Sequence, residues 1–206
     1  MGCDIALYCE GRLDGKWINI DRWYRRSGWP EIKVMKGEGF SLVDLIDGAR
    51  DYGLFYLLAG VRGSDETSSY PPIAPPRGLP DEWDALLAEE YDFRDMPDNV
   101  NVHHVSHLTL RELKESGYGE PMPLRGWVDE AEYEEMIRRT AAGRKYQLGF
   151  WDVKAGNFES RGCVLREWNG YLNLNLTSMI EKMERLKKER RIASDDEVRI
   201  VFWFDN

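Results

Sequence analysis

The 206-residue chain has few cysteines, few basic residues and no long apolar run, and each shortage excludes a class of protein. Its three cysteines are too few for a disulfide scaffold, and none of them has the C-x-x-C spacing of a structural zinc site. Cys3 and Cys9 would stand roughly 20 Å apart on one extended strand, beyond the reach of a disulfide. Cys163 is distant in sequence. We therefore expect three reduced thiols and a reducing cytoplasm.

No apolar run approaches the roughly 18 residues that a membrane span requires. No basic-then-apolar leader opens the chain, so nothing predicts a secretory signal. Only 28 Lys and Arg face 37 Asp and Glu, which gives a formal net charge of −9. Because proteins bind nucleic-acid backbones largely through basic side chains, we expect neither a membrane partner nor general nucleic-acid binding.

The residues that are present indicate a folded, soluble protein. Hydrophobic residues make up 42% of the chain and charged residues 32%, a composition typical of globular proteins. The length suits one sizeable core, so a single domain over residues 1–206 is predicted. Aromatic residues reach 12%, a high fraction, and aromatic rings can stack on planar bases.

Alternation of apolar and polar residues predicts strands at both ends of the chain. Residues 3–10 and 16–21 alternate on either side of an Asp14-Gly15 turn signal, which predicts an N-terminal hairpin. Residues 198–205 alternate as well. A C-terminal strand this apolar has to be paired, and the hairpin is its natural partner.

Apolar residues spaced three and four apart predict the helices. One or two helices are expected over 42–61, with a break or bend near 51–53, and others from 81, from 110, over 130–141 and over 172–191. Thr109 and Glu112 form a capping box, and Asp129 starts the helix over 130–141. Five prolines between residues 71 and 80 predict a long loop, and residues 143–170 give no clear assignment. The fold class predicted is α+β: a small, mostly antiparallel sheet built from the N-terminal hairpin and the C-terminal strand, with helices packed on one face and a long Pro-rich loop.

All three histidines fall within residues 103–107. If this segment is extended, His103 and His107 share a face with Val105, and His104 faces the other way with Ser106. One interpretation is a metal or phosphate site that acidic residues complete. Another is the H-x-T-x element of two-histidine phosphoesterases, although the second element that they need is missing. The third is a polar loop that leads into a capped helix.

The Pro-rich loop contains a candidate anion contact. Arg77 and Gly78 lie between Pro76 and Pro80, and such a frame can present a guanidinium group to an anion. The structural alternative is that Arg77 pairs with an acidic residue of the protein.

The opening Met1-Gly2-Cys3-Asp4-Ile5 and the ending Val201-Phe202-Trp203-Phe204-Asp205-Asn206 resemble those of a family of uncharacterised proteins common in bacteriophages and prophages. Five further segments occur in the family's order: residues 50–55, 58–62, 76–80, 106–110 and 124–128. The resemblance covers nearly the whole chain. It implies a phage or prophage context and no mechanism.

The chain departs from the family pattern at two places. Related sequences carry a histidine where this chain has Ala6, and a His-Ser-His-Ser-Trp run where it has residues 103–107. Loss of both histidines together fits a shared site that is absent or altered here. The resemblance therefore implies that Ala6, His103 and Val105 lie near one another.

Two functional hypotheses follow. The first is a phage-type accessory protein that acts by binding: a counter-defence factor that captures a nucleotide-like small molecule or a host defence protein in the host cell cytoplasm. The second is a metal-dependent hydrolase or phosphodiesterase that uses the histidine cluster. No assembled catalytic set is present, so the sequence favours binding over catalysis, with no cofactor and no resident metal. The oligomeric state stays open.

The predicted site lies where the strands of both termini meet. If these strands pair in phase, Asp4 and Tyr8 share a face with Trp203 and Asp205. The ligand-binding residues predicted on this basis are Asp4, Tyr8, Arg77, His103, His104, Ser106, Trp203 and Asp205.

Overall fold

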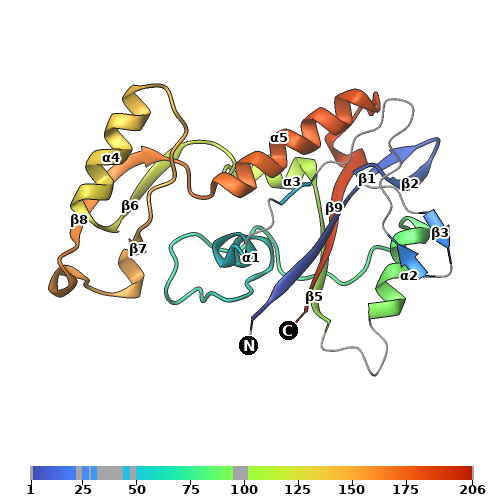
Figure 1. Cartoon of the computed structure of the whole chain (residues 1–206), viewed down its shortest axis with the longest axis horizontal. Coiled ribbons are helices and arrows are strands. Elements are labelled where there is room, and N and C mark those ends of the chain that lie inside the picture. Colours follow the sequence, from blue (N-terminus) through green and yellow to red (C-terminus); the bar gives the residue numbers. More distant parts are fainter. Residues whose placement is uncertain are drawn as a thin grey trace. The chain divides into compact units, whose positions relative to one another are not determined.

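The computed structural model describes residues 2–21, 25–27, 29–31, 44–46, 50–94 and 102–205. The chain forms two compact units. Unit 1 comprises Met1–Arg50, Pro76–Glu112 and Met179–Asn206, and unit 2 comprises Asp51–Pro75 and Leu113–Ser178. Figure 1 shows the elements of both units. The single domain expected from the length stays a prediction.

Unit 1 is built on a four-stranded antiparallel sheet in the order β2-β1-β9-β5 (Figure 1). The strands are β1 (Asp4–Leu13), β2 (Lys16–Asn19), β5 (His103–Thr109) and β9 (Val198–Asp205). Asp14 and Gly15 both have positive φ angles, 49° and 78°, as the tight hairpin turn requires. The expected hairpin is therefore confirmed.

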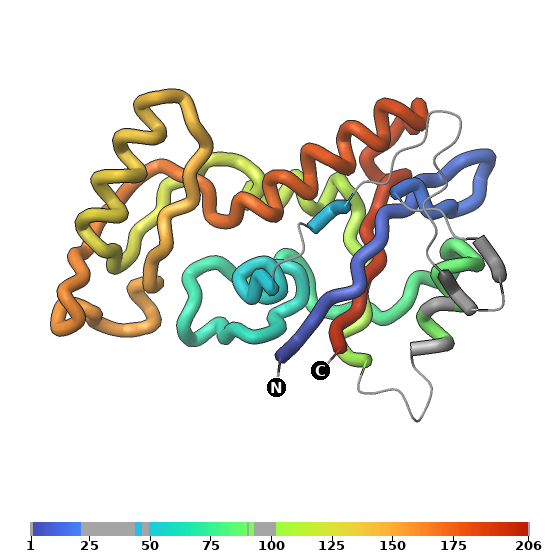
Figure 2. The backbone as a smooth tube through the Cα atoms, in the orientation of Figure 1, coloured from blue at the N-terminus to red at the C-terminus, as the bar shows by residue number. Residues whose placement is uncertain are grey.

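The C-terminal strand pairs with the N-terminal hairpin, as the alternation predicts. Asp4 stands opposite Asp205, and Gly11 stands opposite Val198. Figure 2 shows the two ends of the chain running side by side, blue against red. Phe202, Trp203 and Phe204 are all fully buried, so β9 is covered on both faces and its pairing removes an apolar edge from water.

Unit 1 contains further elements besides this sheet. A two-stranded ribbon joins β3 (Arg25–Ser27) to β4 (Trp29–Glu31), and the helices are α2 (Ala85–Arg94), α3 (Leu110–Glu115), α5 (Leu174–Glu189) and η3 (Asp195–Glu197). The first residues of α3 and the last part of α5 belong to unit 1. The capping box is confirmed, because Thr109 N–H donates to Glu112 Oε2 at 2.8 Å and Glu112 N–H donates to Thr109 Oγ1 at 3.2 Å.

Unit 2 contains a three-stranded antiparallel sheet in the order β7-β6-β8. Its elements are β6 (Met122–Val128), β7 (Trp151–Asp152), β8 (Val164–Gly170), α1 (Tyr52–Ala59), α4 (Glu130–Ala141), η1 (Val153–Ala155) and η2 (Glu159–Arg161). The buried core lies between this sheet and α4 and consists of Leu124, Val128, Met136, Leu148 and Trp168.

The α+β class is confirmed, but the sequence pattern did not reveal the sheet of unit 2. Pro123 and Gly126 interrupt the alternation in β6, and β7 has only two residues. The predicted helices at 130–141 and 172–191 are confirmed within two residues at each end. Of the one or two helices expected over 42–61, with a break or bend near 51–53, α1 forms the second part. Residues 41–43 and 47–49 lie outside the described residues. Within the part of the chain that is described, no helix has the length and apolar content to cross a membrane.

Candidate functional site

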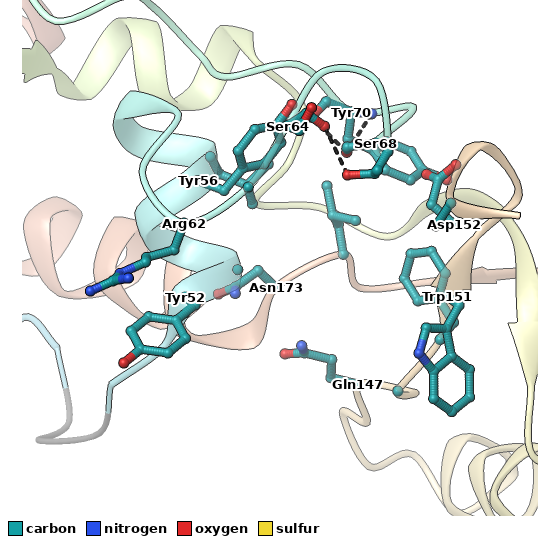
Figure 3. A pocket seen from close by; sticks show the side chains of 18 of the residues that line it. Tyr52, Tyr56, Arg62, Ser64, Ser68, Tyr70, Gln147, Trp151, Asp152 and Asn173 are labelled. Atoms are coloured by element: carbon teal, nitrogen blue, oxygen red, sulfur yellow. Dashed lines mark hydrogen bonds between the residues drawn. The ribbon is translucent and has the colours of Figure 1, made fainter. Parts of the chain in front are cut away.

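Unit 2 contains a cavity of about 480 Å³. Figure 3 shows its walls: α1 and the loop that follows it on one side, and the segment that leads into β7 on the other. Five aromatic side chains line it, namely Tyr52, Tyr56, Tyr70, Phe150 and Trp151. The cavity is therefore mainly aromatic, with polar groups at defined places.

The α1 wall is fixed by the carboxylate of Asp51. Its Oδ1 accepts a hydrogen bond of 2.9 Å from Leu54 N–H and so caps the helix. Its Oδ2 accepts hydrogen bonds of 2.8 Å from the side-chain amides of Asn173 and Asn175. One carboxylate thus joins the start of α1 to the start of α5.

Tyr52 and Tyr56 lie one turn apart on α1 and so face the cavity together. Tyr52 is 40% exposed, whereas Tyr56 is buried. The Tyr56 hydroxyl donates to Asp65 Oδ1 at 2.5 Å. Burial and this carboxylate raise the pKa of Tyr56 to about 12, so the phenol keeps its proton near neutral pH.

The loop that follows α1 is fastened to β7 by Asp152. Asp152 Oδ1 accepts hydrogen bonds from Ser69 Oγ (2.8 Å) and from Lys154 N–H (2.9 Å), and Oδ2 accepts one from Ser69 N–H (2.8 Å). Lys154 Nζ in turn donates to the Ser68 carbonyl at 2.9 Å. Because both oxygens of this buried carboxylate already accept hydrogen bonds, Asp152 has a structural role in closing the cavity.

The rim carries an exposed aromatic face on each side. Trp151 is 42% exposed and stacks on Phe158 with ring centroids 5.4 Å apart. On the α1 side, Arg62 Cζ lies 5.7 Å from the centroid of the Tyr52 ring. Figure 3 shows Arg62 and Tyr52 on one side of the cavity and Gln147 and Trp151 on the other.

None of the eight residues predicted to bind a ligand lines this cavity. They lie in unit 1, and their binding role stays a prediction. The expected facing of the terminal strands is confirmed, because Asp4 pairs with Asp205 and Ala6 pairs with Trp203 in register. Tyr8 and Trp203 are in contact at 5.3 Å between ring centroids, but both are buried.

Tyr8 and Trp203 belong to a core cluster with Leu87 and Val201, and Ala6 and Val105 pack against it. Of the three residues that the resemblance places near one another, Ala6 and Val105 thus pack against the same cluster, and the proximity of His103 to them stays a prediction. Asp4 is exposed, with its two oxygens accepting hydrogen bonds of 2.6 and 3.0 Å from the Arg50 guanidinium. The hydrogen bond from Arg50 lowers the pKa of Asp4.

A bulge changes the facing of the histidines. The register of β5 shifts between His103 and Ser106, and His104 adopts a left-handed conformation with φ of 50°. The extra residue places His103 opposite Phe204. The two rings are stacked, with their centroids 5.9 Å apart. The expectation that His103 shares a face with Val105 and His107 is therefore wrong, since it assumed a regular strand.

The histidine rings nonetheless form local contacts. The Nδ1 atoms of His103 and His104 are 2.7 Å apart, and His103 Nε2 lies 4.0 Å from Cys3 Sγ. His107 Nδ1 lies 3.3 Å from the Gly78 carbonyl, and burial lowers its pKa. No group of three or more His, Cys, Asp or Glu residues in the described ranges is arranged to hold a metal ion.

Arg77 pairs with an acidic residue of the protein, which is the structural alternative to an anion contact. Its guanidinium pairs with Glu112 at 2.6 Å, and its backbone N–H donates to the buried Ser106 hydroxyl at 3.2 Å. The structure thus brings Arg77, Ser106 and Glu112 together at the start of α3, where they connect the Pro-rich loop to β5.

Sequence reasoning missed the residues of the cavity in unit 2. Two weak signals were present: the high aromatic fraction, and the segments 50–55 and 58–62 that take part in the family resemblance. No protein-family model, curated protein or solved structure matches the chain. The function proposed below is therefore inferred from the geometry of the site.

Proposed function

We propose that the protein acts by binding and that the cavity of unit 2 captures a small molecule with a planar ring, of the nucleotide-like class expected from the sequence. The observation that carries this proposal is the pair of exposed rings at the rim. Tyr52 and Trp151 are 40% and 42% exposed at the edge of a cavity of about 480 Å³. Small-molecule sites commonly have volumes of about 300–1,000 Å³.

The physical reason is the surface that the rings present. A base that stacks on an aromatic side chain gains about 1–3 kcal/mol. Trp151 is preorganised for such stacking because Phe158 stacks on its ring and restricts its rotation. The hydroxyl and amide groups around the rings supply hydrogen-bonding partners for the ligand's polar edge.

We prefer binding to hydrolysis as the function because the carboxylate of Asp152 is already hydrogen-bonded within the protein. It is the only carboxylate among the described residues that line the cavity, and both its oxygens already accept hydrogen bonds from the protein. A general base needs an oxygen within reach of a substrate proton. The resemblance to phage and prophage proteins supports the wider role, in which capture of the ligand counters host defence in the host cytoplasm.

Calorimetric titration of the protein with a panel of ribonucleosides and ribonucleotides tests the proposal. We expect saturable binding by at least one probe of the panel and a loss of at least about tenfold in affinity in Trp151→Ala, since one stacking contact is removed. Ile137→Ala is the matched control, because Ile137 is 50% exposed on α4 and does not line the cavity. Absence of binding by every probe, or equal affinity in Trp151→Ala, would refute the proposal.

A further inference from the structure

The side-chain oxygens on the cavity walls are largely engaged within the protein. Gln147 Oε1 accepts from Leu174 N–H at 2.8 Å, and Asn173 Oδ1 accepts from Leu176 N–H at 2.8 Å. Asp152 is satisfied in the same way. Because these acceptors are in use, the wall favours a ligand whose polar edge supplies hydrogen-bond acceptors, while the hydroxyl groups of the wall can donate or accept.

Gln147 is the only glutamine in the chain, and its orientation is determined by its neighbour. The Leu174 N–H requires an acceptor, so the carbonyl oxygen of the Gln147 amide faces it and the NH₂ group is directed elsewhere. No described residue accepts a hydrogen bond from this NH₂ group. Figure 3 shows the amide in the space between Tyr52 and Trp151.

Arg62 supplies the positive charge of the site. It is the only cationic side chain among the described residues that line the cavity, and it lies at the outer edge beside Tyr52. Its backbone has φ of 63°, a conformation that non-glycine residues adopt at a cost. Arg62 follows Gly60 at the end of α1, and Figure 3 shows its side chain at the outer edge of the cavity, directed away from Gln147 and Trp151.

We infer that the cavity selects a nucleoside monophosphate, with the ring read by the Gln147 NH₂ group and the phosphate by Arg62. This inference rests on the proposed function and names its ligand class. One cation matches one phosphate group, since a guanidinium binds phosphate through paired hydrogen bonds. The carboxylate of Asp152 already accepts three hydrogen bonds from the protein, so it offers few free lone pairs to the magnesium ion that usually accompanies a triphosphate.

The phosphate contact is tested by comparing a nucleoside with its 5′-monophosphate. Adenosine, guanosine, cytidine and uridine, each with its monophosphate, serve as probes, and ATP and GTP are added as triphosphates. In the wild-type protein we expect at least one monophosphate to bind about tenfold or more tightly than its nucleoside, and more tightly than the triphosphate. In Arg62→Gln this preference should disappear while nucleoside affinity is unchanged, and Arg62→Lys should retain part of it.

The matched control for Arg62 is Arg185→Gln, which removes the same charge from an exposed position on α5 in unit 1. It should leave the preference for the monophosphate unchanged. An equal loss in both glutamine variants would show that only the net charge of the protein matters, and would overturn the assignment to Arg62.

The ring contact is tested by Gln147→Glu. The carboxylate still accepts from Leu174 N–H, and a negative charge at the start of α5 is favourable, so the melting temperature should not fall. The NH₂ donor is lost, however, and the affinities for nucleoside and monophosphate should both fall at least about tenfold. Asn157→Asp is the control, because Asn157 Oδ1 also accepts a backbone N–H, that of Glu159 at 2.8 Å, and does not line the cavity.

The outcomes distinguish failure of the ring-binding function from failure of the ligand class assigned to it. If nucleosides and monophosphates bind equally and Trp151→Ala weakens both, the ring-binding function stands and the phosphate assignment is overturned. A triphosphate that binds more tightly than its monophosphate overturns the single-phosphate class. Unchanged affinity in Gln147→Glu overturns the role of its NH₂ group. If no probe binds to the wild-type protein, the proposed function fails together with this inference.

Discussion

Asp51 and Asn173 are 122 positions apart in the chain, and their side chains are joined by a hydrogen bond of 2.8 Å. The other oxygen of Asp51 caps α1. The position of Tyr52 and Tyr56 in the cavity wall therefore depends on a contact between the starts of two helices. This contact is long-range, whereas most helix caps use only neighbouring residues.

Substitution of Asp51 by alanine should destabilise the protein more than loss of an ordinary helix cap. A cap contributes about 1 kcal/mol, and each of the two additional hydrogen bonds contributes about 0.5–1.5 kcal/mol, so we expect the free energy of unfolding to fall by about 2–4 kcal/mol. Asp129→Ala is the control, because Asp129 caps α4 through local N–H groups only. Urea denaturation measures both variants. Equal losses would show that the hydrogen bonds to Asn173 and Asn175 contribute nothing.

Gly126 is required in β6 because Phe150 and Trp151 approach its backbone closely. A Cβ atom at this position would lie 2.4 Å from Phe150 Cδ2 and 2.7 Å from the Trp151 carbonyl oxygen. Gly126→Ala should therefore cost about 1–3 kcal/mol of stability, as measured by chemical denaturation. At Gly149 a Cβ atom would have only an ordinary contact of 3.5 Å with Glu132, so Gly149→Ala should be tolerated better. Full stability of Gly126→Ala would contradict this packing.

Glu112 should make stability depend on pH in the acid range. Burial alone raises the pKa of Glu112, but hydrogen bonds from Arg77 and Thr109 outweigh it and hold the folded-state pKa below its ordinary value of 4.5. A lowered carboxyl pKa stabilises the folded state above 4.5, and this contribution is lost as the pH falls through the folded-state pKa. Glu112→Gln, which can still form the capping box, should show a weaker loss of stability below pH 4.5.

Denaturation at a series of pH values measures this effect, and Glu134→Gln, at an exposed position of α4, is the control. The wild-type protein and the control should lose stability in parallel. A parallel loss in Glu112→Gln as well would show that the ion pair with Arg77 makes no contribution.

The cysteines should react only after unfolding. None of the three forms a disulfide, and all are buried. Burial and the nearby acidic side chains of Asp21 and Glu10 also raise the pKa of Cys9, which disfavours the reactive thiolate. Titration with a thiol reagent should detect three thiols in denaturant without reductant and much slower reaction in the native protein. Detection of a single thiol in denaturant would indicate a disulfide.

Local patterns in the sequence determined the elements whose stabilising contacts are local or repetitive. The hairpin turn at Asp14-Gly15 and the Thr109–Glu112 capping box each involve residues within three positions of one another. The pairing of β1 with β9 is long-range, yet it was predictable because two apolar strands have to be buried and alternation defines their faces.

Tertiary structure alone decided the rest. Left-handed backbone at His104 shifts the register of β5 and turns His103 away from the face that strict alternation assigns to it. The cavity exists because Asp152 holds Ser69 and Asp51 holds Asn173, pairs that are 83 and 122 positions apart. No periodicity in the sequence encodes such contacts, because each is a single hydrogen bond between two side chains that are far apart in the chain. The stabilisation from such a hydrogen bond appears only once the fold has brought both partners together.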